Sequence, residues 1–159
     1  MAETRLKIPK FLKEVTLWVH PEGRVVGSLF LREQSINHAG IEEPIEALNQ
    51  EQPFIVLQRQ SPAELRFYNL SSIVRVEYPN DDSEPAQDVV KLPCTVHLMD
   101  GAMIPGSIRE RLPHDHARLF DYLNRGSDRF VKIHCEDDTV CLVNKSYIIQ
   151  VTSPEVSDW

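Results

Sequence analysis

The sequence predicts a mainly β protein with short helices, built as two tandem five-stranded small barrels that are related by a pseudo-twofold axis. Each barrel is expected to carry one inserted helix. Two observations lead to this prediction. The chain of 159 residues contains an internal repeat, and each repeat holds five short segments in which apolar and polar residues alternate. Alternation with a period of two is typical of strands that bury one face.

The internal repeat is visible as matches in the same order at nearly constant spacing. At an offset of 79, Thr16, Gly27, Ser28 and Arg32 recur as Thr95, Gly106, Ser107 and Arg111. A second set of matches follows at an offset of 75 or 76. It pairs Leu48 with Leu123, Asn49 with Asn124, Phe54 with Phe130, Asn69 with Asn144, Ser71 with Ser146, Ile73 with Ile148 and Val76 with Val151. The sequence therefore predicts a first repeat at 1–78, an acidic linker at 79–90 and a second repeat at 91–159.

Each repeat is expected to contain the same elements. The predicted strands of the first repeat are 15–20, 24–31, 54–59, 64–69 and 73–78, and those of the second are 94–99, 102–109, 130–135, 139–143 and 147–152. Pro44 begins a predicted helix in the first repeat, and Asp115 is expected to cap the second. Gly27 and Gly106 lie inside second strands, where glycine indicates a bulge or sharp bend. Curling into a barrel would remove most open edges, although the sequence leaves open one fused sheet.

Composition places the protein in an ordinary globular class. It is 42% hydrophobic and 26% charged, and no apolar run approaches the ~20 residues that cross a bilayer. The N-terminal residues have no apolar run of a signal peptide, and three cysteines form no disulfide framework, so we expect a cytoplasmic protein that does not bind membranes. The net charge of −7 comes mostly from the second half and disfavours non-specific nucleic-acid binding.

Two stretches of the second repeat resemble the motifs of Sm-like small barrels. "CTVHLMDGAMIPGSI" is similar to the first motif and "TVCLVNKSYIIQVT" to the second, and "VTLWVHPEGRVVGSL" and "ELRFYNLSSIVRVEY" resemble them more weakly. SH3-like barrels with the same strand order share this pattern. The resemblance implies a bent five-stranded barrel, oligomerisation through the edges of the last two strands, and in many members RNA binding at a ring's pore.

The resemblance does not transfer the family's RNA-binding residues. An inserted helix occupies the place of the base-contacting Asp and Asn, and Asn69-Leu70 and Asn144-Lys145 replace the usual Arg-Gly. The segments 118–124 and 142–145 are also loosely similar to an uncharacterised bacterial protein family, which implies no activity.

The candidate partner-binding residues are Trp18, His20 and His97. In an alternating strand, Trp18 and His20 face away from the core, and His97 is the counterpart of Trp18 in the second repeat. An outward-facing tryptophan indicates contact with another surface, either the other repeat, another subunit or a separate protein.

Five arginines around the second helix are candidate contacts for RNA or another anion: Arg109, Arg111, Arg118, Arg125 and Arg129. The alternative is a solvated face with local ion pairs, such as Asp121 with Arg125. His114 and His116 are weak candidates for a metal site, because no further ligand spacing accompanies them. Cys135 and Cys141 flank a predicted turn and are interpreted as apolar core residues.

No catalytic motif is present, and no cofactor is expected. The sequence therefore favours a non-enzymatic scaffold or adaptor that binds protein partners or itself. RNA binding on the arginine-bearing face of the second repeat is the alternative.

Overall fold

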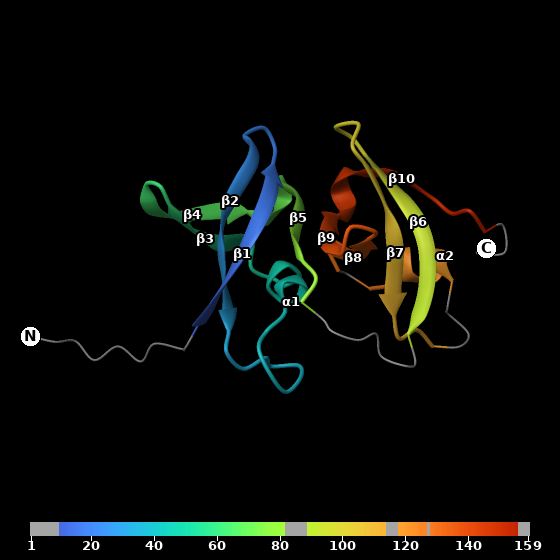
Figure 1. Cartoon of the computed structure of the whole chain (residues 1–159), viewed down its shortest axis with the longest axis horizontal. Coiled ribbons are helices and arrows are strands. Elements are labelled where there is room, and N and C mark those ends of the chain that lie inside the picture. The colour runs from blue at the N-terminus through green and yellow to red at the C-terminus, as the bar shows by residue number, and fades with distance from the viewer. Residues whose placement is uncertain (1–9, 82–88, 114–117, 127, 156–159) are drawn as a thin grey trace, which may run out of the picture.

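The protein forms one open sheet of ten antiparallel strands with two short α-helices in the residues that the computed structural model describes, which are 10–81, 89–113, 118–126 and 128–155 (Figure 1). The first repeat contains β1 (Lys10–Val19), β2 (Gly23–Arg32), α1 (Pro44–Leu48), β3 (Phe54–Gln60), β4 (Ala63–Asn69) and β5 (Ile73–Pro79). The second contains β6 (Val90–Leu98), β7 (Met103–Glu110), α2 (Leu119–Leu123), β8 (Phe130–Cys135), β9 (Thr139–Asn144) and β10 (Ile148–Thr152). A 3₁₀ turn precedes the last strand of each repeat, η1 (Leu70–Ser72) and η3 (Lys145–Tyr147).

The order of the strands in the sheet shows how the repeats are joined. It runs β10-β6-β7-β8-β9-β5-β1-β2-β3-β4, so both repeats arrange their own five strands in the same spatial order. The fifth strand of the first repeat pairs with the fourth strand of the second, with Val76 opposite Leu142. We call this β5–β9 pairing the internal interface. Among the described residues, it leaves β4 and β10 as the two end strands of the sheet, which we call the free edges.

The arrangement is the fused sheet that the sequence left open, and closure into two separate barrels stays a prediction. The expected twofold relation between the repeats is wrong for the strand pairing. A twofold axis would make β4 meet β10 wherever β5 meets β9, whereas β4 and β10 lie at opposite ends of the sheet. The contact joins two different surfaces and is therefore head-to-tail.

The strands agree with the predicted segments in the middle and differ at their ends. β1 begins at Lys10 and β6 at Val90, several residues before the predicted starts. The early part of β1 pairs with β2 from Lys10 to Glu14, but its side chains are largely exposed, so no alternation marks it. Most of the predicted linker, residues 82–88, lies outside the described residues.

Gly27 and Gly106 are needed because the next strand crosses close to them. A Cβ on Gly106 would overlap the backbone oxygen of His134 in β8, and one on Gly27 would lie 2.7 Å from Cγ of Leu57 in β3. The pairing of β2 with β3 is short, Ser28 with Gln58 and Leu29 with Leu57, which is consistent with a sharply bent strand. Close approach of backbones is one of the recognised reasons for glycine inside a strand.

Two apolar clusters form the core, and each takes residues from both repeats. The first cluster consists mainly of the first repeat but includes Phe130, Val140 and Leu142. The second consists mainly of the second repeat but includes Val74, with Trp18 packed against it. Because each cluster is completed by the other repeat, burial at the internal interface stabilises both.

Replacement of Gly106 by alanine should reduce the free energy of unfolding by about 1–3 kcal/mol, because the added methyl group meets backbone that cannot rotate away. Urea unfolding of Gly106→Ala checks this. The control is Met103→Ala on the exposed side of the same strand, which should change the free energy by less than about 0.5 kcal/mol. Equal effects of the two substitutions would contradict the close approach of β7 and β8.

Candidate functional site

The internal interface joins the repeats through both apolar packing and polar contacts. Val140 and Leu142 of β9 face the first cluster, whereas Cys141 and Val143 face the second, so β9 is buried on both sides. This explains the unbroken apolar run in β9, since a strand covered on both faces needs no polar alternation.

Hydrogen bonds to backbone atoms lock this interface in register. Asn144, which is fully buried, donates from Nδ2 to the carbonyl oxygens of Leu70 at 3.3 Å and Ile73 at 3.0 Å. Asn49, at the end of α1, accepts from the Phe130 N–H at 2.8 Å and donates to its carbonyl oxygen at 3.3 Å. Buried polar groups that are fully paired specify one arrangement, so the relative placement of the repeats is defined by these amides.

The free edge at β4 carries the counterparts of the residues that the internal interface buries. The hairpin registers match, because Phe67 lies opposite Val56 in the first repeat as Leu142 lies opposite Lys132 in the second. The exposed fractions of Phe54, Leu65 and Phe67 are 50%, 53% and 65%, and those of their counterparts Phe130, Val140 and Leu142 are 1%, 1% and 0%. The same apolar positions are therefore filled in both repeats but covered in only one.

The free edge at β10 shows the complementary difference. The pairing register shifts at Val74 in β5 and at Ile149 in β10, so both are bulge residues at equivalent positions. A bulge re-aims its side chain. Val74 is 6% exposed because it enters the second cluster, whereas Ile149 is 63% exposed.

A charged cleft of about 520 Å³ lies where α1 meets the second repeat. The first repeat contributes acidic residues to it, and the second contributes mainly basic ones. The charged lining residues are Arg32, Glu42, Glu43 and Glu46 from the first repeat and Arg109, Glu110, Arg125, Asp128 and Lys132 from the second. Burial raises the pKa of Glu110, although Arg125 and Lys132 oppose the shift. The cleft thus holds five acidic and four basic residues and belongs to the contact between the repeats.

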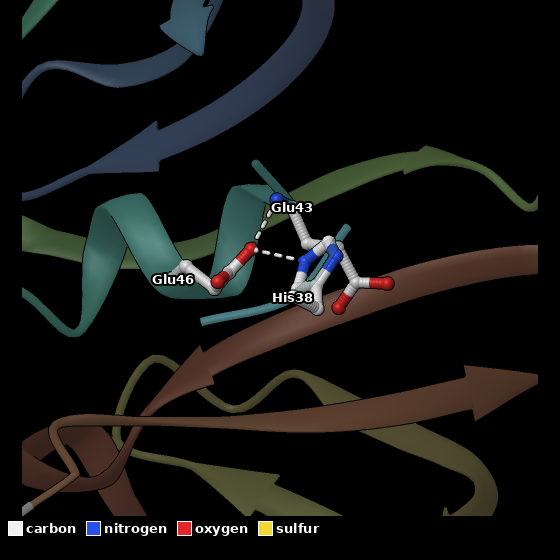
Figure 2. Close-up of side chains that lie close together, drawn as sticks. All are labelled: His38, Glu43 and Glu46. Atoms are coloured by element: carbon white, nitrogen blue, oxygen red, sulfur yellow. Dashed lines mark hydrogen bonds and ion pairs between the residues drawn. The ribbon is translucent and has the colours of Figure 1, made fainter. Parts of the chain in front are cut away.

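His38, Glu43 and Glu46 lie close enough to hold a metal ion (Figure 2), but the Glu46 carboxylate is already in use. Its Oε1 accepts from Ser35 Oγ at 2.7 Å and Asn37 Nδ2 at 2.9 Å, and its Oε2 accepts from the Glu43 N–H at 2.6 Å. His38 Nε2 lies 2.9 Å from the same Oε2. This carboxylate caps α1 and ties the preceding loop to it, which is a structural role.

The predicted partner-binding residues do not form one surface. Trp18 packs against the second cluster, and the Arg75 guanidinium lies 4.0 Å from the centre of its ring. The exposed His20 has its ring 6.4 Å from that of Tyr147, across the internal interface. His97 lies beside β10, with Nε2 at 3.2 Å from Thr152 Oγ1. Trp18 thus packs against the cluster that consists mainly of the second repeat.

The five candidate arginines are likewise dispersed. Arg118 forms two hydrogen bonds with Asp121, at 2.9 and 3.2 Å, and Arg109 and Arg125 line the charged cleft opposite glutamates. Arg111 is exposed, and Arg129 is partly buried and accepts a backbone hydrogen bond from Lys145. Arg109 and Arg125 thus come together in the cleft, whereas Arg118 is paired within its own helix region.

The remaining candidates are the histidines and cysteines. His114, Asp115 and His116 lie outside the described residues, and α2 begins at Leu119 with Arg118 as its N-cap residue. Cys94 and Cys141 are buried thiols, Cys135 is partly buried, and none of the three forms a disulfide. Burial raises the pKa of the Cys135 and Cys141 thiols. This environment disfavours the reactive thiolate.

The resemblance implied contacts through the edges of the last two strands, but sequence reasoning named none of the residues on those edges, although a signal was present. The run "TVCLVN" in β9 is apolar throughout, whereas its counterpart "ELRFYN" in β4 alternates. That difference indicates that β9 is covered on both faces and that β4 is covered on only one.

None of the helices among the described residues is long and apolar enough to span a membrane. Comparison with protein-family models, curated proteins and solved structures finds no match to this chain.

The Glu46 cap makes stability depend on pH in the acid range. Burial acts to raise the pKa of Glu46, but the hydrogen bonds from Glu43, Asn37, Ser35 and His38 outweigh it and lower the pKa from 4.5 to about 2. A lowered folded-state pKa stabilises the protein above the unfolded-state value, and this contribution is lost as pH falls towards 2.

The free energy of unfolding of the wild type should therefore fall between about pH 5 and pH 2 more steeply than that of Glu46→Gln. Urea unfolding at several pH values measures the slope. Glu51→Gln, an exposed position after α1, controls for the loss of one charge. If Glu46→Gln kept the slope of the wild type, the cap would not carry this dependence.

Proposed function

We propose that this protein is a non-enzymatic scaffold that assembles with further molecules of itself, by pairing β4 of one chain with β10 of the next. The observation that carries the proposal is the internal interface, which already joins a fourth and a fifth strand of these two repeats. The finer architecture that goes with it is a row of small Sm-like or SH3-like barrels, two from each chain.

The register of the proposed contact follows from the repeat. At the internal interface Val76 lies opposite Leu142, and Glu77 lies opposite Cys141. The equivalent pairs are Val151 with Phe67 and Thr152 with Arg66. Asn69 would then take the position of Asn144. The Asn144 side-chain amide donates hydrogen bonds to the carbonyl oxygens of Leu70 and Ile73 across the internal interface.

The apolar residues at both edges support this contact. Burial of the exposed part of Phe54, Leu65, Phe67 and Ile149 would contribute on the order of 1 kcal/mol for each side chain. The edge at β10 also lacks the charged residues and proline that commonly protect an exposed strand. β4 contains no proline or lysine, and its two charged residues, Glu64 and Arg66, are paired with each other.

A head-to-tail contact repeats from chain to chain until a ring closes or a filament grows. The protein would thus present many equivalent surfaces in a regular order, which suits a scaffold. RNA binding, the alternative, has less support. Arg118 is paired with Asp121, and the cleft that holds Arg109 and Arg125 is lined by more acidic than basic residues.

Size-exclusion chromatography with light scattering should show an oligomer that resists high salt, since the contact is apolar and backbone-paired. The double variant Leu65→Lys/Phe67→Lys should weaken association at least about tenfold, because it would place two charges in a buried contact. Ile36→Lys is the matched control, since Ile36 is more exposed but lies in the loop before α1 and away from both free edges. A wild-type monomer at all concentrations, or a monomer with salt-sensitive bound nucleic acid, would overturn the proposal.

Disulfide trapping tests the register. Cysteines at Phe67 and Val151 should link chains into a ladder on a non-reducing gel, because directly opposite residues in an antiparallel pair are close enough to bond. Phe67→Cys with Gln150→Cys is the control, since a shift of one residue places the thiols on opposite faces. The bond cannot form within one chain, because β4 and β10 lie at opposite ends of the sheet. Equal trapping by both pairs would contradict the register.

A further inference from the structure

We propose that helix α2 of one chain docks into an apolar groove beside β3 and β4 of a second molecule, with Phe120 as its anchor and Asn124 bonded to the backbone of Phe54. This inference rests on the proposed assembly and identifies a second contact that the strand edges do not supply. It also gives a role to the inserted helix of the second repeat.

The template for this contact is α1 at the internal interface. α1 lies against β8, and Asn49 at its C-terminal end binds both backbone groups of Phe130. Asn49 is the repeat counterpart of Asn124, and Phe130 is the counterpart of Phe54. Next to a second molecule, α2 would therefore lie against β3 and bring Asn124 to Phe54.

The groove that would receive α2 is present at the free edge. Its volume is about 470 Å³, and its apolar lining includes Phe30, Ala47, Phe54, Ile55, Val56 and Leu65. Lys10, Arg32, Glu42, Gln50 and Gln52 complete the lining. Phe54 and Leu65 are half exposed there. Exposed apolar side chains that gather in one groove indicate a contact with another apolar surface.

At two equivalent positions, the side chains of the groove are charged at the internal interface and apolar at the free edge. In the second repeat Arg109 and Lys132 stand where the groove has Phe30 and Val56, and they line a cleft with Glu43 and Glu46 of α1 and its N-cap. At the free edge the groove is apolar at both positions. At the internal interface, the charged residues of the second repeat meet the charged helix α1. At the free edge, the apolar residues at the equivalent positions are available to α2.

Helix α2 has the matching character. Phe120, which is 47% exposed, replaces Ile45 of α1. The counterparts of Glu43 and Glu46 are Arg118 and Asp121, which neutralise each other within the helix. The helix therefore needs no charged partner in the groove, and a large aromatic side chain is its main exposed apolar feature.

Asn124 requires only a change of its hydrogen-bond partner. Its Nδ2 now donates to the Phe120 carbonyl oxygen at 2.9 Å, at the C-terminal end of α2. The Asn124 backbone N–H also donates to that oxygen, so the helix end keeps a bond when the side chain turns to Phe54. The side chain would then make the two bonds that Asn49 makes.

The test is sedimentation velocity of the full chain over a range of concentrations. Phe120→Lys should raise the Kd for association at least about tenfold, and Asn124→Ala should raise it a few-fold. Ile36→Lys should leave it unchanged. Thermal melts monitored by circular dichroism establish that each variant is folded, since Phe120 is a half-exposed residue whose change should not unfold the monomer.

A pair of opposite charges introduced across the proposed contact should restore association. Ile45 and Lys132 line the same cleft at the internal interface, so Phe120 and Val56 should be neighbours between molecules. Val56→Glu in the Phe120→Lys background should recover much of the lost association. If the wild type assembles but Phe120→Lys and Asn124→Ala assemble equally well, or if the charge pair recovers nothing, the helix docking is wrong while the strand pairing stands. A wild-type monomer overturns both.

Discussion

The structure depends on the pairing of β5 with β9. A five-stranded unit with this strand order has two unpaired edges, and unpaired backbone groups next to an apolar core are costly unless water or another strand satisfies them. The pairing satisfies one edge of each repeat and places β9 between the two clusters. Both cores are completed across it, so neither repeat is finished by its own residues.

The duplicated strands have diverged according to what covers them. β9 is apolar on both faces, and its buried Asn144 bonds backbone carbonyls of the first repeat. β4 keeps polar residues on one face but retains leucine and phenylalanine at the positions that the interface would bury. Apolar residues without a covering surface are the main argument that a further contact exists, because solvent alone does not favour them.

The charged residues orient the inserted helix α1, whereas the apolar residues form the core. Glu46 has all its acceptor positions occupied and fixes the loop before α1, while the nearby glutamates face basic residues of the second repeat. These interactions orient α1 at the internal interface. α2 has instead an internal ion pair and an exposed phenylalanine, so the two inserted helices suit different surfaces.

The sequence by itself determined the repeats, the approximate strands and the two glycines inside bent strands, because alternation and close backbone approach act on neighbouring residues. It also contained the contrast between "TVCLVN" and "ELRFYN", which distinguishes a strand covered on both faces from one that is not. Only the tertiary structure decided that Trp18 packs against the second cluster, that Arg109 and Arg125 line the cleft beside α1, and that the repeats join head-to-tail. These features depend on pairing and packing between residues that are far apart in the sequence, sixty or more positions at the internal interface. A pattern of local spacing does not encode which strand edges will meet.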